Sequence, residues 1–481
     1  MKYRLLNIIC VLAMFTGCSD FLVQEPDLQV SFNEQLSTRE GVLEAYSGIY
    51  RDIEAILSSK FAIYADALGG NITFTPSVTQ GTISVPEQIE RVYNFNAIPE
   101  DLNFEDYYED FYSIINQVNL ILDRFSEFSF FTDTELNQLQ AELLTIRAFA
   151  HYQVAIVFAQ NYGFTADASH LGIVYSTTVL IAGEDFPERE TMASTYSSIK
   201  VDLDDALALY NSTQLLSGPS YSYFNTLTTS ALYARIALQM NDWETARDFA
   251  NTVITTSGIN LTLKENYIIE WEAEELPITE IILEFSAPRT SEGDVSSSIS
   301  AFFIYNSSTN YADYSASGDV LNLYSTEDIR SNMFIQEGLN TSINGVESLQ
   351  DYFFTKKFQD QAGTTFIRLS ELYLIRAEAN AKLNALGSAL QDLNNIRERA
   401  NLEALLTQDN LLDQIFLERR RELAFEGHLL FDIARYKKDI ERNAGCISTI
   451  CDLNFPSNFY ILPIPESSVL LNQNMQQNEG Y

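Results

Sequence analysis

Apolar residues recur every three or four positions along much of the chain, which is the spacing of an amphipathic helix. From Glu135 to Tyr162 they fall at Leu136, Leu139, Leu143, Ile146, Ala150, Val154 and Val157. The same spacing predicts helices over Val42–Leu57, Phe104–Phe125, Met192–Tyr210 and Leu411–Phe425. We therefore expect a mainly α-helical protein with few and short strands.

Two segments, Ala231–Ile254 and Ile375–Arg397, repeat one pattern of small, polar and large residues. In this pattern Ala234, Asn241 and Ala246 correspond to Ala377, Asn384 and Ala389. Small residues let two antiparallel helices approach closely, and Asn suits the turn between them. The pattern resembles a degenerate tetratricopeptide hairpin. Trp243 occupies an aromatic position of such a hairpin, so we expect it to pack in the core.

Helical periodicity fades over about residues 68–101 and 258–366, where Ser, Thr, Asn and Tyr become frequent. The second segment contains the stretch Ala301–Tyr324, with aromatic residues Phe302, Phe303, Tyr305, Tyr311, Tyr314 and Tyr324. Long irregular segments in compact domains are usually functional or disordered, and a high aromatic content argues against disorder. We expect these two segments to form a face that binds a ligand.

The N-terminus has the layout of a secretory signal, with Lys2 and Arg4 before an apolar run from Leu5 to Phe15. This run is too short to span a bilayer. It ends at Thr16-Gly17-Cys18, which resembles a bacterial lipobox. We expect residues 1–17 to be removed and Cys18 to carry the lipid, with 18–481 as the mature chain; the alternative is a plain secretion signal with a stray cysteine.

Charge and cysteine content narrow the possible partners. The formal net charge of −37 repels nucleic acids and anionic head groups, so neither is an expected partner. Cys446 and Cys451 lie close together in a chain exported to an oxidising compartment, which favours a disulfide between them. With no histidine nearby, a zinc site is not expected there. The sequence indicates no metal and no cofactor.

Catalytic motifs are missing from the sequence. Its three histidines, His151, His170 and His428, have no metal-ligand spacing, and there is no HExxH, GxSxG or P-loop pattern. Paired carboxylates are uninformative among 66 acidic residues. The densest charged cluster contains Glu418, Arg419, Glu422, Glu426 and Arg435. We interpret this cluster as ion pairs that join the last helices, and we do not expect an enzyme.

These landmarks together resemble the SusD/RagB family of outer-membrane glycan-binding lipoproteins. The resemblance rests on the lipobox leading into CSDFL, on RETMASTY at 189–196 before DLDDAL, on ERRRELAFEGHLLFDIAR at 418–435, and on the ending FYILPIPESSVLLNQNMQQNEGY. The family usually ends in Gln-Asn-Pro-Gly-Tyr, where this chain has Glu479 for the proline. Leu429 also departs from the pattern, since a basic residue is common there.

The resemblance implies one SusD-like domain over 18–481, with tetratricopeptide-like helical repeats and a loop-rich ligand face. It also implies a surface-exposed lipoprotein of the outer membrane that captures oligo- or polysaccharide and passes it to a SusC-like TonB-dependent transporter. Asp20, Glu25 and Asp27 resemble the acidic export signal that follows the lipidated cysteine in such proteins. In the family the repeats contact the transporter and the opposite face binds glycan.

Sugar binding needs aromatic rings that stack on the C–H face of a pyranose and polar groups that bond its hydroxyls. The candidates for stacking are Tyr305, Tyr311, Tyr314, Trp271 and Phe74, and the polar candidates are Asp66, Asn71 and Arg91. Trp271 has a second interpretation as part of an edge segment packed on the core. Two other functions stay open, namely a scaffold lipoprotein that binds a protein or peptide, and a glycoside hydrolase.

Overall fold

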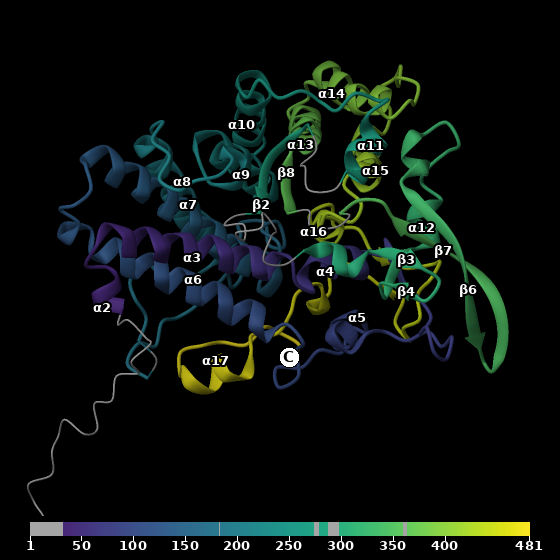
Figure 1. The fold of residues 1–481 in the computed structure, drawn as a ribbon, viewed down its shortest axis with the longest axis horizontal. Helices are drawn as coiled ribbons and strands as arrows, with labels where there is room; N and C mark the ends of the chain where they lie inside the picture. The colour runs from purple at the N-terminus through teal and green to yellow at the C-terminus, as the bar shows by residue number, and fades with distance from the viewer. Residues whose placement is uncertain (1–31, 182, 274–278, 287–297, 359–362) are drawn as a thin grey trace, which may run out of the picture.

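The computed structural model describes residues 32–181, 183–273, 279–286, 298–358 and 363–481. Cys18 and the expected signal peptide lie outside these residues. The fold is mainly helical, as the apolar spacing predicts (Figure 1). None of the helices in the described ranges combines the length and the apolar character that crossing a membrane requires.

The helices run through most of the described chain, and the longest of them, α3, α6, α7 and α8, lie in its first half. They are α2 (Phe32–Gln35), α3 (Arg39–Leu57), α4 (Phe61–Gly69), α5 (Glu90–Tyr93), α6 (Glu105–Asp123), α7 (Asp133–Phe158), α8 (Met192–Leu209), α9 (Thr226–Gln239), α10 (Trp243–Thr256), α11 (Tyr267–Glu272), α12 (Gly318–Leu321), α13 (Leu369–Lys382), α14 (Leu386–Arg399), α15 (Leu411–Glu422), α16 (Leu429–Arg435) and α17 (Glu466–Leu471). All five helices predicted from spacing are confirmed to within three or four residues at each end.

Side-chain caps set the starts of the long helices. Thr132 accepts a hydrogen bond from the Glu135 backbone N–H, and the Glu135 carboxylate accepts one from the Thr132 N–H, so α7 begins at Asp133. Thr38 caps α3 in the same way by accepting from the Gly41 N–H. These caps satisfy backbone groups that the first turn of a helix leaves unpaired.

The strands form antiparallel two-stranded sheets. The pairs are β1 (Ile72–Phe74) with β5 (Tyr314–Ala316), β2 (Ile281–Phe285) with β8 (Thr364–Arg368), β3 (Tyr305–Ser307) with β4 (Asn310–Tyr311), β6 (Phe334–Ile343) with β7 (Val346–Thr355), and β9 (Ile440–Glu441) with β10 (Asp452–Leu453).

The β6–β7 hairpin differs from the expectation of short strands, since each strand has ten residues. Asn344 and Gly345 connect the strands with φ angles of 52° and 78°, which is the geometry of a tight hairpin turn. In Figure 1 this hairpin projects at the edge of the molecule. Its inner face packs around Leu339, Tyr352 and Phe354.

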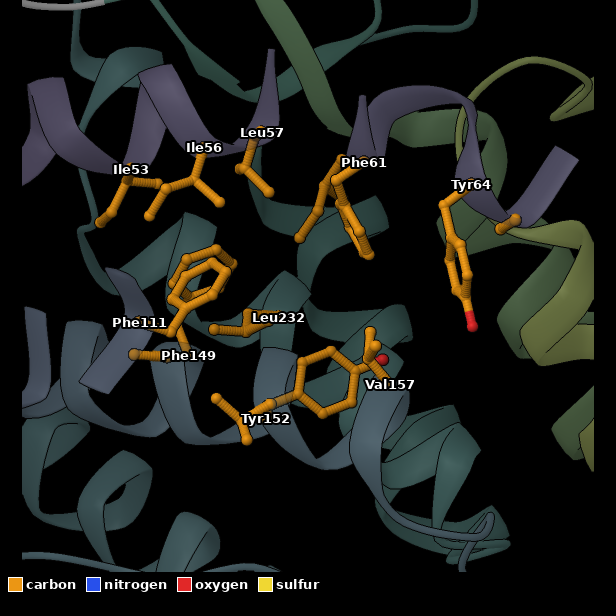
Figure 2. Packing of buried hydrophobic residues seen from close by; sticks show 14 of the residues in the cluster. Ile53, Ile56, Leu57, Phe61, Tyr64, Phe111, Phe149, Tyr152, Val157 and Leu232 are labelled. Atoms are coloured by element: carbon orange, nitrogen blue, oxygen red, sulfur yellow. The ribbon is translucent and has the colours of Figure 1, made fainter. Parts of the chain in front are cut away.

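Helix α7 lies at the centre of the helical core and is buried on nearly all sides. Its spacing predicts an amphipathic helix with a solvent face, and that detail is wrong because α6, α8 and α9 all pack against it. Figure 2 shows Phe149 of α7 meeting Phe111 of α6, with ring centroids 5.9 Å apart. Helices on several sides exclude water from α7, so alternation along one helix is a poor guide to its exposure.

The two predicted hairpins are α9–α10 and α13–α14, and α10 packs against α13. Asn241 and Asn384 stand in the turns with φ angles of 60° and 61°, a left-handed conformation that Asn tolerates well. The four small residues of the pattern, Ala234, Ala246, Ala377 and Ala389, are fully buried. The repeat prediction is therefore confirmed, and Trp243 lies half-buried against the core.

A buried ionic network joins the end of α15 to three other elements. Arg330 Nη1 lies 2.9 Å from Glu422 Oε2, and Arg368 Nη1 lies 2.6 Å from Glu422 Oε1. Arg399 also pairs with Glu422. Burial alone raises the pKa of Glu422, but Arg399, Arg368 and Arg330 hold that pKa well below its usual value. The interpretation of this region as structural ion pairs is confirmed.

Removing the Glu422 carboxylate leaves three buried guanidinium groups without their shared partner. We expect Glu422→Ala to lower the free energy of unfolding by about 3–5 kcal/mol, because three buried guanidinium groups each lose a charged partner while they stay out of water. Urea unfolding followed by circular dichroism measures this loss. Asp413→Ala on the same helix is the matched control, since Asp413 pairs with Lys438 at the surface and should matter by less than about 1 kcal/mol. Equal losses in the two variants would contradict the role given to Glu422.

A second buried carboxyl, Glu142 of α7, is surrounded by neutral groups. Its Oε2 accepts from the Tyr46 hydroxyl and, at 3.1 Å, from the Tyr50 hydroxyl, while its Oε1 accepts from Gln138 Nε2 at 2.8 Å. Burial raises the pKa of Glu142 well above its usual value. A carboxyl with a raised folded-state pKa stabilises the fold below its unfolded-state pKa and loses that contribution as pH rises through the folded-state pKa.

Replacing Glu142 by Gln keeps the shape of the side chain and removes its ionisation. We expect Glu142→Gln to raise the free energy of unfolding at pH 8 by at least about 1.4 kcal/mol, the value of one pKa unit, and by less at pH 5. Urea unfolding at the two pH values tests this.

Glu135→Gln is the control of opposite sign. Hydrogen bonds from the Thr132 backbone and from Arg39 lower the pKa of Glu135 to about 2, so its contribution is present at neutral pH and lost on acidification. We expect Glu135→Gln to lower stability at pH 8. A gain for Glu142→Gln that does not grow with pH would refute the assignment.

Candidate ligand-binding site

The two irregular segments come together in space. Strand β1, from the first segment, pairs with β5 of the second, with Ile72 opposite Ala316 and Phe74 opposite Tyr314. The pairing continues beyond the strands, since the Thr75 backbone N–H donates to the Asp313 carbonyl at 3.0 Å. Segments that lie far apart in sequence thus build one surface.

The loop from 75 to 83 then joins this surface to the long hairpin. The Tyr311 hydroxyl donates to the Pro76 carbonyl at 2.8 Å, and the Ser342 N–H of β6 donates to the Gly81 carbonyl at 2.7 Å. Gly81 has a φ of 66°, and a Cβ there would lie 2.9 Å from the Asn340 carbonyl oxygen, so only glycine fits. We call the exposed face of loop 75–83, β3–β4 and β6–β7 the tyrosine face.

Tyr305 and Tyr311 are cross-strand partners on β3 and β4 at the centre of this face. Both are half-buried and pack on Phe354, with ring centroids 4.8 Å and 5.9 Å away. Phe354 is fully buried and supports the two rings from below. The turn between them exposes short hydroxyl and amide side chains, namely Asn306, Ser307, Ser308, Thr309 and Asn310.

Three of the predicted stacking residues are corrected by the structure, because they are buried. Phe74 packs between Tyr93 and Tyr314, with centroids 4.7 Å and 5.8 Å away. Trp271 packs on Phe358 and lies under the cations of Lys357 and Arg368. Phe74, Tyr314 and Trp271 therefore form the support beneath the surface, and no ring face among them is open to a sugar.

Asp66 and Asn71 are also corrected, because protein groups already occupy their polar atoms. Asp66 accepts from the backbone N–H groups of Phe425 and Gly427, at 3.0 Å and 2.9 Å, and from Asn71 Nδ2 at 2.7 Å. Asn71 Oδ1 accepts from Arg420 Nε at 2.9 Å. Burial raises the pKa of Asp66. These two residues fasten α4 to the turn after α15 rather than face a ligand.

Arg91 is the predicted polar residue that stays at the surface, where it forms an ion pair of 2.6 Å with Asp101. One turn earlier lies Gln88, an exposed residue that the sequence reasoning missed, and its Nε2 donates to the Tyr314 hydroxyl at 2.8 Å. Gln88 lies three residues before Arg91, a spacing that places side chains on one face of a helix, and this spacing could have identified Gln88 from the sequence. The buried Tyr314 thus positions a surface amide beside the tyrosine face.

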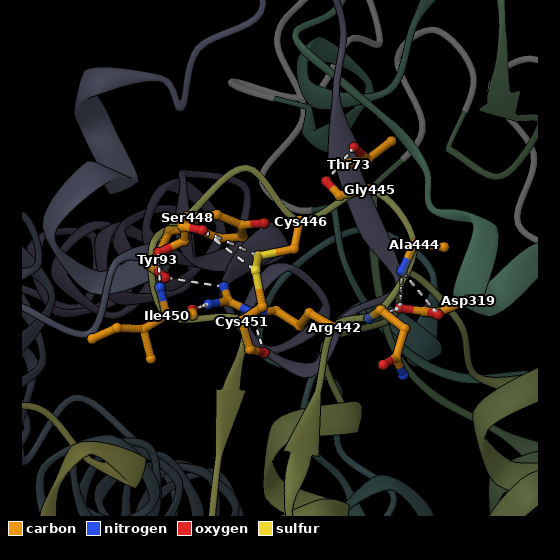
Figure 3. The surroundings of a disulfide bond; sticks show 11 residues. Thr73, Tyr93, Asp319, Arg442, Ala444, Gly445, Cys446, Ser448, Ile450 and Cys451 are labelled. Carbon is orange, nitrogen blue, oxygen red and sulfur yellow. Dashed lines mark hydrogen bonds between the residues drawn. A yellow bond between two sulfur atoms is a disulfide. The ribbon is translucent and has the colours of Figure 1, made fainter.

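The structure joins Cys446 and Cys451 in a disulfide, and residues 442–445 directly before it bond to both irregular segments (Figure 3). Thr73 of β1 donates its hydroxyl to the Gly445 carbonyl at 2.8 Å. Asp319 of α12 accepts from the Asn443 N–H at 2.8 Å, and Arg442 Nη1 donates to the Tyr93 carbonyl at 3.0 Å. Residues 442–445 therefore connect both irregular segments to the C-terminal region.

The histidines do not form a catalytic arrangement in the part of the chain that the structure describes. Burial lowers the pKa of His151 to about 3 and that of His428 to about 4, so both are neutral at physiological pH. His151 Nε2 accepts from the Ser176 N–H at 3.0 Å and is a packing residue. Among the described residues, no group of three or more His, Cys, Asp or Glu is placed to hold a metal ion.

Two protein-family models match different parts of this chain. The family model described as "SusD family" matches residues 303–481, and the one described as "Starch-binding associating with outer membrane" matches residues 20–238. The SusD-like protein P38 of Formosa agariphila is 20% identical over 90% of this chain and 91% of its own length. The starch-binding protein SusD of Bacteroides thetaiotaomicron is 34% identical over 24% of this chain and 21% of its own length.

Solved structures share the whole architecture. A SusD superfamily protein from Bacteroides thetaiotaomicron is 23% identical and superposes with a TM-score of 0.79, covering 92% of this chain and 99% of that one. A SusD-like carbohydrate binding protein from Bacteroides vulgatus is 21% identical with a TM-score of 0.73, covering 91% of this chain and 96% of that one. These two likenesses show the fold. The two family models, which match residues 20–238 and 303–481, show that the chain belongs to the SusD/RagB family.

Proposed function

We propose that this chain is a cell-surface lipoprotein that captures an oligo- or polysaccharide and delivers it to a SusC-like TonB-dependent transporter. Family membership supports the general role, since one matching family model is described as starch-binding and associated with the outer membrane. The role is binding rather than catalysis. The transporter is proposed from the family resemblance.

The tyrosine face is the observation that carries the proposal. Tyr305 and Tyr311 expose part of their rings at the surface, and Phe354 fixes them from below. The β3–β4 turn between them exposes hydroxyls and amides, and Gln88, which bonds to Tyr314, and Arg91, three residues further on, are additional polar candidates. A pyranose ring offers C–H groups for stacking and hydroxyls for hydrogen bonds, and this face offers both kinds of partner.

Starch is the first glycan to test, because the relative that is 34% identical over a local match is named a starch-binding protein. The acidic character of the chain favours a neutral glycan of this kind, since the net charge of −37 repels polyanions. A linear α-1,4-glucan such as maltoheptaose is therefore a suitable probe. Other neutral oligosaccharides belong in the same panel.

Anchoring through Cys18 completes the proposal. The apolar run Leu5–Phe15 ends against Thr16-Gly17-Cys18, and two or more acyl chains on that cysteine make membrane attachment stable. Asp20, Glu25 and Asp27 follow within one short segment and match the acidic signal for export to the surface.

Removing both exposed rings should weaken glycan binding without unfolding the protein. We expect Tyr305→Ala combined with Tyr311→Ala to reduce the free energy of binding by about 1–3 kcal/mol, because each aromatic contact is worth about 0.5–1.5 kcal/mol. Isothermal titration calorimetry against the panel measures this change. Tyr314 stays unaltered, since it is part of the buried support.

The matched control is Tyr373→Ala, a half-buried tyrosine on the repeat helix α13. It should leave affinity unchanged. Undiminished binding by the folded double variant would place the glycan elsewhere and refute the site. Release of reducing ends from the bound glycan would instead indicate a hydrolase and refute the binding-only role.

Replacing Cys18 by Ala should remove the lipid and with it the membrane attachment. We expect the variant to shift from the detergent phase to the aqueous phase in Triton X-114 partitioning, because no acyl chain is then available to enter the bilayer. Labelling with radioactive palmitate provides the direct control. A variant that stays in the detergent phase would show that Cys18 is not the anchor.

A further inference from the structure

A large apolar groove lies far from the tyrosine face, between α6, the segments 174–181 and 183–187, and α17. Its volume is about 910 Å³, and its apolar walls include Tyr108, Tyr112, Leu120, Val179, Leu180 and Met475. In Figure 1, α17 lies below α6, apart from the repeat helices α10, α13 and α14 and apart from β3 and β4. The groove is thus separate from the helical repeats and from the tyrosine face.

One wall of the groove is held in place by amide side chains of α6. Asn116 Oδ1 accepts from the Leu180 N–H at 3.0 Å, and Asn116 Nδ2 donates to the Leu180 carbonyl at 3.1 Å. Asn119 Nδ2 donates to the carbonyls of Ser176 and Thr178. These bonds satisfy the backbone of an irregular segment and fix it along the helix.

The opposite wall, α17, is fastened by the same chemistry. Asn472 Nδ2 donates to the Pro187 carbonyl at 2.8 Å, and Asn474 Nδ2 donates to the Phe186 carbonyl at 2.6 Å. The Ser467 hydroxyl donates to Glu105 on α6 at 2.8 Å. Both walls are therefore fixed before any partner arrives, which lowers the entropic cost of binding.

Apolar side chains along the groove remain in water. Leu470 and Leu471 of α17 are 73% and 72% exposed, and Ile181 of the facing segment is 51% exposed. Leu471 and Ile181 line the groove, and Leu470 adjoins it. Neighbouring exposed apolar residues beside a groove are typical of an interaction surface.

The charge around the groove selects the kind of partner. Glu109 and Asp185 are its charged lining residues, and no Lys or Arg lines it within the described ranges. Glu105, Asp110, Glu184 and Glu466 are close to these residues in sequence or on the same helices. This acidic rim repels anionic lipid, and it repels a second copy of a chain whose net charge is −37.

We propose that this groove docks a segment of a partner protein that has apolar side chains flanked by Lys or Arg. The apolar residues of the segment cover Leu470, Leu471 and Ile181, and its basic residues face Glu109 and Asp185. Interfaces of this kind combine an apolar centre with a complementary charged rim. The inference goes beyond the proposed glycan capture and uses none of its residues.

A fluorescein-labelled helical peptide with leucines at i, i+3, i+4 and i+7 and lysines on both flanks is the probe, measured by fluorescence anisotropy. We expect the wild-type protein to bind it with a Kd below about 100 μM. Leu470→Ser combined with Leu471→Ser should weaken binding at least about tenfold, because Leu471 lines the groove and Leu470 extends its exposed apolar edge. Glu109→Gln, which removes the charge and keeps an acceptor for Ser467, should weaken it less.

Two controls separate the groove from general attraction to an acidic protein. Leu406→Ser replaces a leucine that is 91% exposed outside this groove, and it should leave the Kd unchanged. The same peptide with Glu for Lys should bind at least about tenfold more weakly than the Lys peptide. All variants should retain glycan binding, so a failure here is distinct from a failure of the proposed function.

Several results would overturn the inference. They are no binding of the Lys peptide by the wild type, equal binding by the Leu470→Ser, Leu471→Ser variant, and equal binding of the Glu peptide. Sedimentation velocity tests whether a second copy of this chain occupies the groove. A wild-type dimer that the double leucine variant abolishes would show that a second copy covers the groove, contrary to the proposal.

Discussion

Glu422 holds a negative charge where water does not reach, and the arrangement of the C-terminal half depends on how that charge is neutralised. Its three arginine partners come from the 3-10 helix Ile329–Asn332, from the end of β8 and from the end of α14. Arg368 also pairs with Glu280, directly before β2, and with Glu426. Because a buried carboxylate is tolerated only with its partners in place, strands, repeat and terminal helices must assemble together.

The same network determines where the tyrosine face can form. Lys357 follows β7 and donates to the carbonyls of Glu422 and Ala424 and to the Glu426 carboxylate, so the base of the long hairpin is tied to the end of α15. Asp66 connects α4, and through it β1, to the turn at Phe425 and Gly427. The irregular segments therefore rest on a rigid polar base. A surface that must present rings to a hydrated ligand benefits from such preorganisation, since fixing loops on binding costs free energy.

Sequence reasoning succeeded where structure is local. The helix predicted over Glu135–Tyr162 is α7, and Asn241 and Asn384 stand in the turns of the repeats, because helices and turns depend on residues a few positions apart. It was weaker where side chains are placed by distant partners. Tyr311 and Tyr314 have the same composition around them, but Tyr314 is buried because β5 pairs with β1, about 240 residues earlier in the chain. No local pattern reports that pairing, and the same holds for Phe74, Asp66 and Asn71.

The sequence also concealed the apolar groove, for a reason that follows from its construction. Leu470 and Leu471 continue an apolar pattern that on a short helix normally indicates core packing. Asn472 and Asn474 bind the backbone at Pro187 and Phe186 and fasten the end of α17, whose leucines are exposed. The two amides thus fix the position of α17, while the apolar area of its leucines stays in water. Burial of a leucine is favourable by about 1.5–3 kcal/mol, so two exposed leucines favour binding of a partner surface that covers them.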